Sequence, residues 1–558
     1  MKLPPPIRPP ERLKEAAALA DEARLAEALA VLGPGEPSGM SAPAALLAAR
    51  CLLDRPDPVA ALRFATRAAG PGPNPVTRIE ALMMIGRIRT GLGQDRLAAE
   101  TYRAVLALRP EHEEARLLLG RALVDLGWPD LAREALAPLP RPLPGWWRQV
   151  EDWAARGIET ARREARARLA RRTAPLAGDA AGLVRYLIRA GRLAAAAAAL
   201  RRLPEDGEAA WLGACLAERR AWPEPVAVPP IALAPEAPPA LRLEVATWLM
   251  QRGEATAAGD VLAASPDALA DERVALLRAR IMILAGDIDR FERLSSAAPA
   301  DLPQRSLVPR LRLTALALRG DPAPLGVADL PAEPPAAGDV PLVQYWDREA
   351  PPDDVAEVMA SWAAAHPGLR RLHFHRATAR AYLATHHGDE AAAAFDACPA
   401  PAVEADLLRY AVLAREGGLW ADADDLCRRS WLGVLAVVPP RGLVVSFSDE
   451  LPFYAYNAPL VARPGNAVMQ RALRMSVRSL LRHKAGARFW VWGTTGPGLV
   501  TRLIAADPAR VRLMGKALLR HLSTPADRLA YKFDRAADWR PASDSSVRSR
   551  AAVSASAG

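Results

Sequence analysis

Two aspartates separated by one residue, Asp422 and Asp424, are the side chains in this sequence with the clearest chemical potential. They follow a short apolar segment, Leu419-Trp420-Ala421, which we interpret as a buried strand that runs straight into Asp422-Ala423-Asp424. Residues two apart on a strand point to the same side and lie about 7 Å apart. Two carboxylates placed in this way can share one hard divalent cation with the phosphates of a nucleotide, so the pair predicts a site for Mn²⁺ or Mg²⁺. The structural alternative is an acidic turn formed by Asp422, Asp424 and Asp425.

An amphipathic segment precedes these aspartates. Its apolar residues between positions 406 and 416 have the spacing of a helix with one buried face. Asp406, Arg409 and Tyr410 fall at i, i+3 and i+4, so their side chains share one patch of this helix. Gly417-Gly418 follows and ends the helix, because glycine adopts the left-handed backbone most easily. The alternative for Asp406 and Arg409 is an ordinary exposed ion pair on the helix surface.

The whole string from Ala405 to Asp424 reads ADLLRY, six further residues, and then GGLWADAD. It resembles the signature of the DxD sugar-nucleotide glycosyltransferases, which include fungal initiating mannosyltransferases, bacterial capsule glycosyltransferases and glucosylating clostridial toxins. Gln344-Tyr345-Trp346-Asp347 is similar to the first strand of that family, and Thr495-Gly496-Pro497-Gly498 is similar to its TGP motif. The resemblance covers residues 340–507 and implies a GT-A-like domain that transfers a sugar, with retention at the anomeric carbon.

The resemblance also implies roles for individual side chains. Asp424 would be the direct metal ligand, while Asp422 would contact the sugar or ribose and share the metal. Asp406 and Arg409 would hold the sugar hydroxyls of the donor, so the expected catalytic residues are Asp406, Arg409 and Asp422. The expected donor-binding residues are Trp346, Tyr410, Gly418, Asp422 and Gly496.

Two of these assignments have plain structural alternatives. Trp346 could stack on the base of the nucleotide, since an aromatic face is a tolerant platform for any base, or it could belong to the core. Gly496-Pro497 could direct free backbone N–H groups at the donor, or it could simply begin a helix, with Pro497 in the first turn.

Further polar residues are weaker candidates. Asn457 matches an asparagine that is common in the family near the acceptor. His521 and Ser523 are rival candidates for an additional metal contact. The four histidines between positions 373 and 387 could suggest a zinc site, but we interpret them as surface or packing residues.

Composition and charge describe a folded protein that works without nucleic acid. Of its 558 residues, 51% are hydrophobic and 24% are charged, which is typical of globular chains. The net charge of +10 could indicate a nucleic-acid partner, but only five of the 73 basic residues are lysine, which indicates a general compositional bias. We therefore expect no nucleic acid, and a basic surface could instead face anionic lipid or a phosphorylated donor.

The cysteines and the hydropathy indicate a cytoplasmic location. Cys51, Cys215, Cys398 and Cys427 form no CxxC pair, so neither a zinc site nor a disulfide framework is expected. No stretch reaches the roughly 18 apolar residues that a membrane span needs. Any membrane contact would be peripheral, at the inner face of the cell membrane.

The first half of the chain has a helical pattern with an internal repeat. Ala81, Gly86, Leu92-Gly93 and Ala98 recur 34 residues later as Ala115, Gly120, Leu126-Gly127 and Ala132, which is the period of tetratricopeptide repeats. Small residues at these positions allow two antiparallel helices to approach closely, and stacked pairs bury a continuous core. The repeats could present a concave surface to a protein partner or an acceptor, or they could act as a spacer or dimerisation arm.

The predicted organisation is an α-helical repeat solenoid followed by an α/β GT-A-like domain with a mainly parallel sheet. We assign residues 1–321 to tetratricopeptide-like repeats, 322–340 to a proline-rich linker, 341–542 to the glycosyltransferase domain and 543–558 to a disordered tail. The expected strands are 342–346, 369–374, 442–447 and 459–462, and the expected helices are 353–366, 378–385 and 467–482.

The predicted function is metal-dependent transfer of a sugar from a UDP- or GDP-sugar to a glycan, lipid-linked or protein acceptor, in the synthesis of a surface polysaccharide or glycan. The alternative is a helical-repeat scaffold whose transferase domain is a degenerate binding module.

Overall fold

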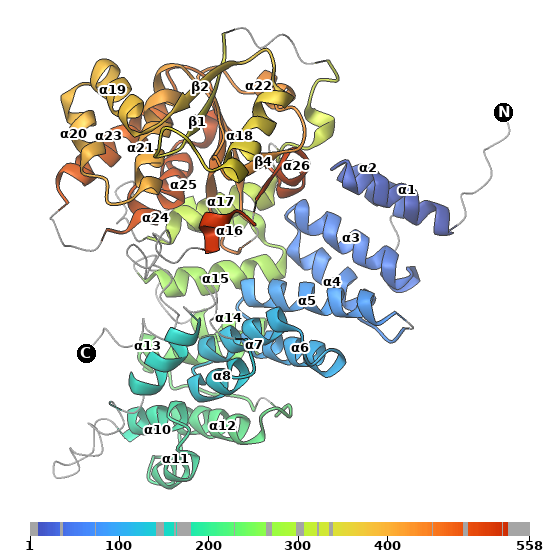
Figure 1. Ribbon diagram of the computed structural model, residues 1–558. Helices are drawn as coiled ribbons and strands as arrows, with labels where there is room; N and C mark the ends of the chain where they lie inside the picture. The colour runs from blue at the N-terminus through green and yellow to red at the C-terminus, as the bar shows by residue number, and fades with distance from the viewer. Residues whose placement is uncertain are drawn as a thin grey trace. The chain divides into compact units, whose positions relative to one another are not determined.

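The computed structural model describes most of the chain (Figure 1). The described residues are 9–33, 37–72, 74–140, 150–160, 163, 180–227, 229–263, 271–296, 306–320, 323–333, 339–448, 450–483, 489–526 and 528–533. They form two compact units: residues 62–287 make up a helical unit, and residues 9–61 and 288–533 make up a unit that contains the β-sheet. The predicted tail, 543–558, lies outside the described residues.

The helical unit consists of antiparallel helix pairs joined by tight turns. Glycines in the left-handed conformation end the first helix of four such pairs: Gly93 and Gly127, which belong to the repeat seen in the sequence, and Gly191 and Gly253. The helices are α5 (Pro75–Gly91), α6 (Asp95–Leu108), α7 (Glu113–Asp125), α8 (Pro129–Leu136), α10 (Ala180–Arg189), α11 (Leu193–Leu200), α12 (Gly207–Ala221), α13 (Pro239–Gln251), α14 (Ala255–Ala263) and α15 (Glu272–Ala285).

Close approach within the pairs explains the small residues of the repeat. A Cβ atom added at Gly86 would lie 2.4 Å from the ring of Tyr102, and one added at Gly120 would lie 2.7 Å from Leu136. The ring of Tyr102 is fully buried between α5 and α6. The absence of a side chain at these two glycines therefore lets a large residue of the second helix fill the interface.

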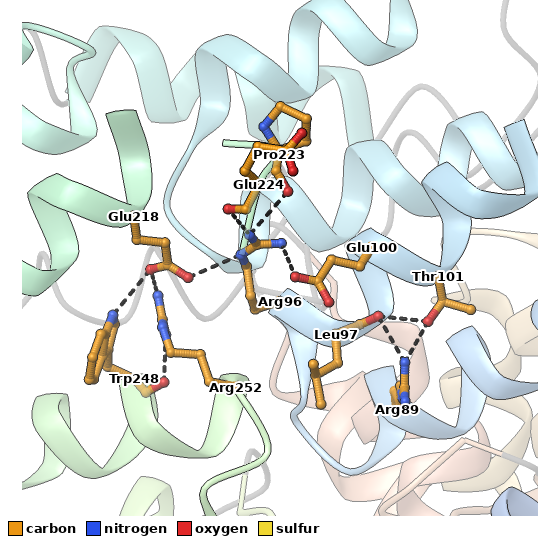
Figure 2. A network of polar contacts seen from close by, with 10 residues as sticks. All are labelled: Arg89, Arg96, Leu97, Glu100, Thr101, Glu218, Pro223, Glu224, Trp248 and Arg252. Atoms are coloured by element: carbon orange, nitrogen blue, oxygen red, sulfur yellow. Dashed lines mark hydrogen bonds and ion pairs between the residues drawn. The ribbon is translucent and has the colours of Figure 1, made fainter. Parts of the chain in front are cut away.

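A buried carboxylate joins three helices of this unit (Figure 2). Glu218 on α12 accepts hydrogen bonds from Arg96 Nε on α6 at 3.0 Å and from Trp248 Nε1 on α13 at 3.3 Å. It also forms an ion pair with Arg252, and burial lowers the pKa of that guanidinium to about 9. The side chain of Glu218 is 6% exposed, so its charge is balanced by these neighbours rather than by water.

The second unit is built on a six-stranded sheet with the order β2-β1-β3-β6-β5-β7. Neighbouring strands are parallel except at β6, which is antiparallel to both β3 and β5. A separate two-stranded ladder pairs β4 with β8. The strands are β1 (Pro341–Tyr345), β2 (Arg370–Phe374), β3 (Gly418–Trp420), β4 (Asp425–Cys427), β5 (Leu443–Phe447), β6 (Ala455–Ala462), β7 (Val511–Met514) and β8 (Ser523–Pro525).

Helices cover both faces of the sheet, so the domain has three layers. Val343, Trp420 and Leu460 face one core together with residues of α17, α19, α20, α21, α23 and α25. The alternate residues Leu342 and Leu419 face a second core with residues of α18, α22 and α26. These helices are α17 (Val308–Arg319), α18 (Asp353–Ala365), α19 (Arg376–His387), α20 (Asp389–Asp396), α21 (Pro401–Arg415), α22 (Leu432–Ala436), α23 (Ala467–Leu481), α25 (Pro497–Ala506) and α26 (Lys516–Leu522).

The unit that contains the sheet also includes helices from the N-terminal part of the chain and from the segments around the sheet. They are α1 (Pro9–Asp21), α2 (Leu25–Leu32), α3 (Ala42–Asp54), α16 (Ile288–Ser296) and α24 (Val491–Thr494), and α4 (Pro58–Ala68) spans the division between the units. Part of the predicted linker packs on the sheet, because the N–H of Leu325 donates to the carbonyl of Leu513 at 2.7 Å. Within the parts of the chain that the structure describes, no helix is both long and apolar enough to cross a bilayer.

The predicted fold class, a helical repeat region followed by a mainly parallel α/β domain, is confirmed. Several boundaries differ. The helix predicted from residue 406 begins at Pro401, because proline is well suited to the first turn. Strand β6 begins at Ala455 rather than at residue 459, and β7 was not expected at all.

A buried histidine supports the second core. His366 lies after α18, stacks on Trp362 and is 1% exposed. Its Nδ1 lies 2.7 Å from the carbonyl oxygen of Trp362, and its Nε2 accepts the N–H of Trp431 at 2.8 Å. Because Nε2 must accept, the ring is held neutral with its proton on Nδ1, and burial lowers the pKa of His366 from 6.5.

We predict that replacing Glu218 with alanine destabilises the helical unit. Arg96 and Arg252 would keep their burial but lose their shared counter-charge, so the free energy of unfolding should fall by about 3–5 kcal/mol. Urea denaturation of the full chain followed by circular dichroism measures this change. Glu134→Ala, at an exposed position on α8, is the matched control and should stay within about 0.5 kcal/mol. Equal midpoints for the two variants would show that the network contributes nothing.

We also predict an acid-sensitive stability that depends on His366. Its folded-state pKa is lowered, so the unfolded chain takes up a proton first as the pH falls below about 6.5, and the folded state is then destabilised by up to about 1.4 kcal/mol per pH unit. The stabilisation is fully present above that pH. Denaturation curves between pH 5 and pH 8 should therefore be flatter for His366→Gln than for wild type, whereas His386→Gln, at an exposed position, should keep the wild-type slope.

Candidate active site

Helix α21 carries the central residues of the site. Almost every residue from Val403 to Ala414 is buried, which is unusual for a helix that also contains charged side chains. Asp406 is 5% exposed and Arg409 is 2% exposed, and the ring of Tyr410 is fully buried. The surface ion pair considered as the alternative for Asp406 and Arg409 is therefore wrong, since neither side chain is at the surface.

Asp406 connects three segments that are far apart in the sequence. Its Oδ1 accepts hydrogen bonds from Arg409 Nη1 at 2.8 Å and from Asn457 Nδ2, on β6, at 2.7 Å. Its Oδ2 accepts from the hydroxyl of Thr495 at 3.0 Å. The hydroxyl of Tyr410 in turn donates to the carbonyl of Thr495. These contacts bring the ADLLRY helix, Asn457 and the TGP segment together.

Burial dominates the electrostatics of this group. It raises the pKa of Asp406 to about 7, although Arg409 and the Thr495 hydroxyl both favour the charged carboxylate. Burial acts to lower the pKa of Arg409, but the carboxylates of Asp422 and Asp406 outweigh it, so the pKa of Arg409 is raised. The guanidinium therefore stays charged between two carboxylates.

Arg409 links the buried helix to the DxD segment. Its Nη2 donates to Asp422 Oδ1 at 2.6 Å, and the same oxygen accepts the indole N–H of Trp420 at 2.8 Å. The guanidinium also lies 5.0 Å from the centre of the Trp420 ring. The structure thus brings together the three residues that were predicted to be catalytic, Asp406, Arg409 and Asp422.

The two aspartates of the DxD segment lie in a turn and not on a strand, which corrects the prediction from the sequence. Strand β3 ends at Trp420, and the N–H of Asp425 donates to the carbonyl of Asp422 at 3.2 Å. The chain turns here because β4, which begins at Asp425, pairs with β8 instead of continuing the main sheet. The strand spacing of about 7 Å therefore does not apply to these carboxylates.

Asp424 has a different set of partners from Asp422. Its Oδ2 accepts the hydroxyl of Tyr531 at 2.9 Å and lies 2.7 Å from Lys532 Nζ. Its carbonyl accepts the N–H of Ala526 at 2.8 Å. The sequence reasoning missed Tyr531 and Lys532, because they lie more than 100 residues away and no local pattern marks them.

Trp346 lies next to Tyr531, one of the partners of Asp424. It follows β1, and its ring meets that of Tyr531 edge to face, with 5.4 Å between the ring centres. It is half-buried and packs on a small apolar cluster that includes Val355, Met359 and Leu529. Its buried Nε1 has no hydrogen-bond partner among the described residues, which leaves one donor for a ligand. Base stacking by Trp346 stays a prediction.

The glycines have structural explanations. Gly417 and Gly418 both have positive φ, of 68° and 107°, and a Cβ added at Gly418 would lie 2.4 Å from the carbonyl oxygen of Pro341. Gly418 thus allows β3 to pass close to β1. Gly496 is the N-cap of α25, with Pro497 in the first turn, as predicted. A nucleotide contact at Gly418 or Gly496 stays a prediction.

The proposed additional metal contacts lie elsewhere in the structure. Nδ1 of His521 lies 3.1 Å from the carbonyl of Asp21, and Ser523 pairs with Cys427 in the small ladder. Among the described residues, no group of three or more His, Cys, Asp and Glu side chains gathers around one point. A closed metal cage made only of those side chains is thus absent from the described part of the chain.

The DxD turn nevertheless suits a cation that binds together with a substrate. Mg²⁺ and similar ions commonly use one or two carboxylates and complete their shell with phosphates and water. The carboxylate of Asp424 is 31% exposed. Burial, followed by the charges of Asp422 and Asp424, raises the pKa of Asp425, which indicates a concentration of negative charge at this turn. The residues present therefore fit a divalent ion held jointly by Asp424 and a bound phosphate.

Comparisons with known proteins match two segments of this chain to family models. Residues 352–439 match a family model described as the glycosyltransferase sugar-binding region containing the DXD motif. Residues 93–152 match a tetratricopeptide repeat model. No curated protein gave a significant match. The solved structure titled PaToxG Glycosyltransferase is 18% identical, covering 31% of this chain and 70% of that chain, with a TM-score of 0.25.

The residues that match the DXD sugar-binding region lie in the unit that contains the mainly parallel sheet, and this unit has the α/β fold, GT-A-like in its mixed sheet, that the resemblance implied. The chain thus carries one segment similar to tetratricopeptide repeats and one similar to the sugar-binding region of the DXD glycosyltransferases, and the resemblance seen in the sequence is confirmed.

We predict that Thr495→Val weakens the site without removing any charge. Valine keeps the shape of threonine but cannot donate to Asp406, so the buried carboxylate loses one of its three partners and the free energy of unfolding should fall by about 1–3 kcal/mol. Urea denaturation followed by tryptophan fluorescence measures this change. Thr385→Val, at an exposed position on α19, should leave stability within about 0.5 kcal/mol of wild type. A Thr495→Val variant as stable as that control would contradict the role of the hydroxyl.

Proposed function

We propose that residues 341–542 transfer a sugar from a UDP- or GDP-sugar to a glycan, lipid-linked or protein acceptor, with the help of Mn²⁺ or Mg²⁺. The observation that carries this proposal is the guanidinium of Arg409 between Asp406 and Asp422, with hydrogen-bond distances of 2.8 and 2.6 Å. This guanidinium holds the DxD turn next to the buried polar side chains of Asp406, Asn457 and Thr495. A structural ion pair alone would not need two further hydrogen-bonding side chains, Asn457 and Thr495, from two other segments.

The side chains divide into two functional sets. Asp422, Arg409 and Asp406 form one rigid chain of hydrogen bonds whose Asp422 end is 34% exposed, and this end would receive the sugar hydroxyls of the donor. Asp424 and the indole N–H of Trp346 form the second set, which would receive the nucleotide. Asp424 would hold a divalent cation at this set, and the chemistry that the cation would supply is positive charge to stabilise the departing nucleoside diphosphate. Retention at the anomeric carbon is the outcome that the family resemblance implies.

The setting of this activity follows the sequence predictions. We propose that the helical unit holds a protein partner or the acceptor, that the product is a surface polysaccharide or glycan, and that the protein acts in the cytoplasm or peripherally at the inner face of the cell membrane. Within the repeats, the buried cluster that joins residues of α5, α6, α7 and α8 supports a stacked array, and arrays of this kind present extended surfaces.

We predict that Asp424→Ala lowers metal-dependent turnover by about 100-fold or more, because it removes the carboxylate that would hold the cation against the phosphates. The measurement is hydrolysis of a panel of UDP- and GDP-sugars with Mn²⁺ and with EDTA. Asp396→Ala, which removes an exposed carboxylate paired with Arg380, is the matched control and should retain full activity. Unchanged Mn²⁺-dependent turnover in the Asp424→Ala variant would refute the assignment of this residue.

A scaffold function is the second candidate, and one observation favours it: Tyr531 and Lys532 already contact Asp424 within the chain. In this case the transferase domain would bind a nucleotide or glycan without turning it over. Calorimetric titration of the same donor panel separates the two functions, since binding without hydrolysis or transfer by the wild-type protein would support the scaffold.

A further inference from the structure

A lysine lies at the carboxylate that is expected to hold the metal. Lys532 Nζ is 2.7 Å from Asp424 Oδ2, and the hydroxyl of Tyr531 donates to the same oxygen at 2.9 Å. The side chain of Lys532 is 17% exposed, so this ion pair is only partly screened by water. An ammonium group and a divalent cation cannot both approach the same oxygen this closely, because their charges repel each other.

The backbone around Lys532 is held in place by other contacts. Leu529 is 5% exposed in the apolar cluster next to α18, and the N–H of Ala530 donates to Asp354 Oδ2 at 2.8 Å. The ring of Tyr531 packs on Trp346. These contacts hold the three residues immediately before Lys532, so the flexible four-carbon stem of Lys532 is the part that can move while the preceding backbone stays in position.

The charges at the turn explain why Asp424 needs a counter-ion before any substrate arrives. Asp422 is paired with Arg409, but Arg409 is shared with Asp406. Asp424 is therefore the carboxylate of the DxD pair whose partner within the chain is Lys532. A partly buried carboxylate without such a partner would be unfavourable.

We propose that Lys532 is an internal counter-ion that occupies Asp424 in the donor-free protein and is displaced by the divalent cation. The freed ammonium group then pairs with the diphosphate of the incoming donor. This inference rests on the proposed function, because it assigns the metal to Asp424 and the diphosphate to the same site. The cation and the nucleoside diphosphate should therefore bind with positive coupling. The cation frees the ammonium group that the diphosphate needs, and the diphosphate gives the displaced ammonium group a new partner.

Removing the ammonium group tests this proposal, with two ligands that should respond in opposite directions. In Lys532→Met, Mn²⁺ alone should bind about fivefold more tightly, since it no longer competes with the lysine. UDP and GDP, titrated in saturating Mn²⁺, should bind about fivefold more weakly, since no freed ammonium group is left to pair with the diphosphate. Electron paramagnetic resonance of free Mn²⁺ and calorimetry of the nucleotides measure these two changes on the full chain.

Two controls isolate the effect. Lys14→Met removes the same charge from an exposed position on α1 and should change neither affinity. Asp424→Ala should abolish the specific Mn²⁺ binding. If Mn²⁺ binds wild type and Lys532→Met equally and is lost in Asp424→Ala, the metal site stands and the counter-ion proposal is overturned. If neither the wild type nor Lys532→Met binds Mn²⁺, both the counter-ion proposal and the metal-dependent function are overturned. A general loss of packing in Lys532→Met would weaken both ligands, and this result also contradicts the proposal.

Discussion

One guanidinium holds the site together. Arg409 lies between Asp406 and Asp422, and its side chain is only 3% exposed. Such a group is stable in the interior only when its charge and its N–H groups are matched, because the loss of hydration costs several kcal/mol per ion. Helix α21 therefore has to lie where the DxD turn can reach it, and β3 has to end where it does. The left-handed glycines at positions 417 and 418 make this short connection between helix and strand possible.

The same physical solution appears in the helical unit. Glu218 is shared between Arg96 and Arg252, as Arg409 is shared between Asp406 and Asp422, and in both cases one buried charge joins elements that are distant in the sequence. The consequences differ. The network around Glu218 is enclosed by α6, α12 and α13 and ties α6 to helices more than 100 residues later in the chain. The network around Arg409 reaches the surface at Asp422, whose side chain is 34% exposed, so one end remains accessible to a ligand.

Much of the fold could be predicted from local pattern. The 34-residue spacing of small residues reflects helix pairs that must approach closely, and the alternation of apolar strands and helices reflects a sheet covered on both faces. The ADLLRY helix, the two glycines and the proline of the TGP segment each occur where predicted, because capping and turn chemistry act over a few residues. The strand assignment for Asp422 and Asp424 was wrong, because the pairing of β4 with the distant β8 turns the chain after Trp420.

The sequence by itself determined the fold class, the similarity to the DXD glycosyltransferases and the local segments that carry the candidate site residues. Only the tertiary structure decided that Asp406 is buried with Asn457 and Thr495, that Asp422 pairs with Arg409, and that Tyr531 and Lys532 contact Asp424. The reason is that local pattern reports backbone preference and burial of one element at a time. The partner of a buried charge is selected by which elements pack together, and that depends on contacts between residues up to about a hundred positions apart.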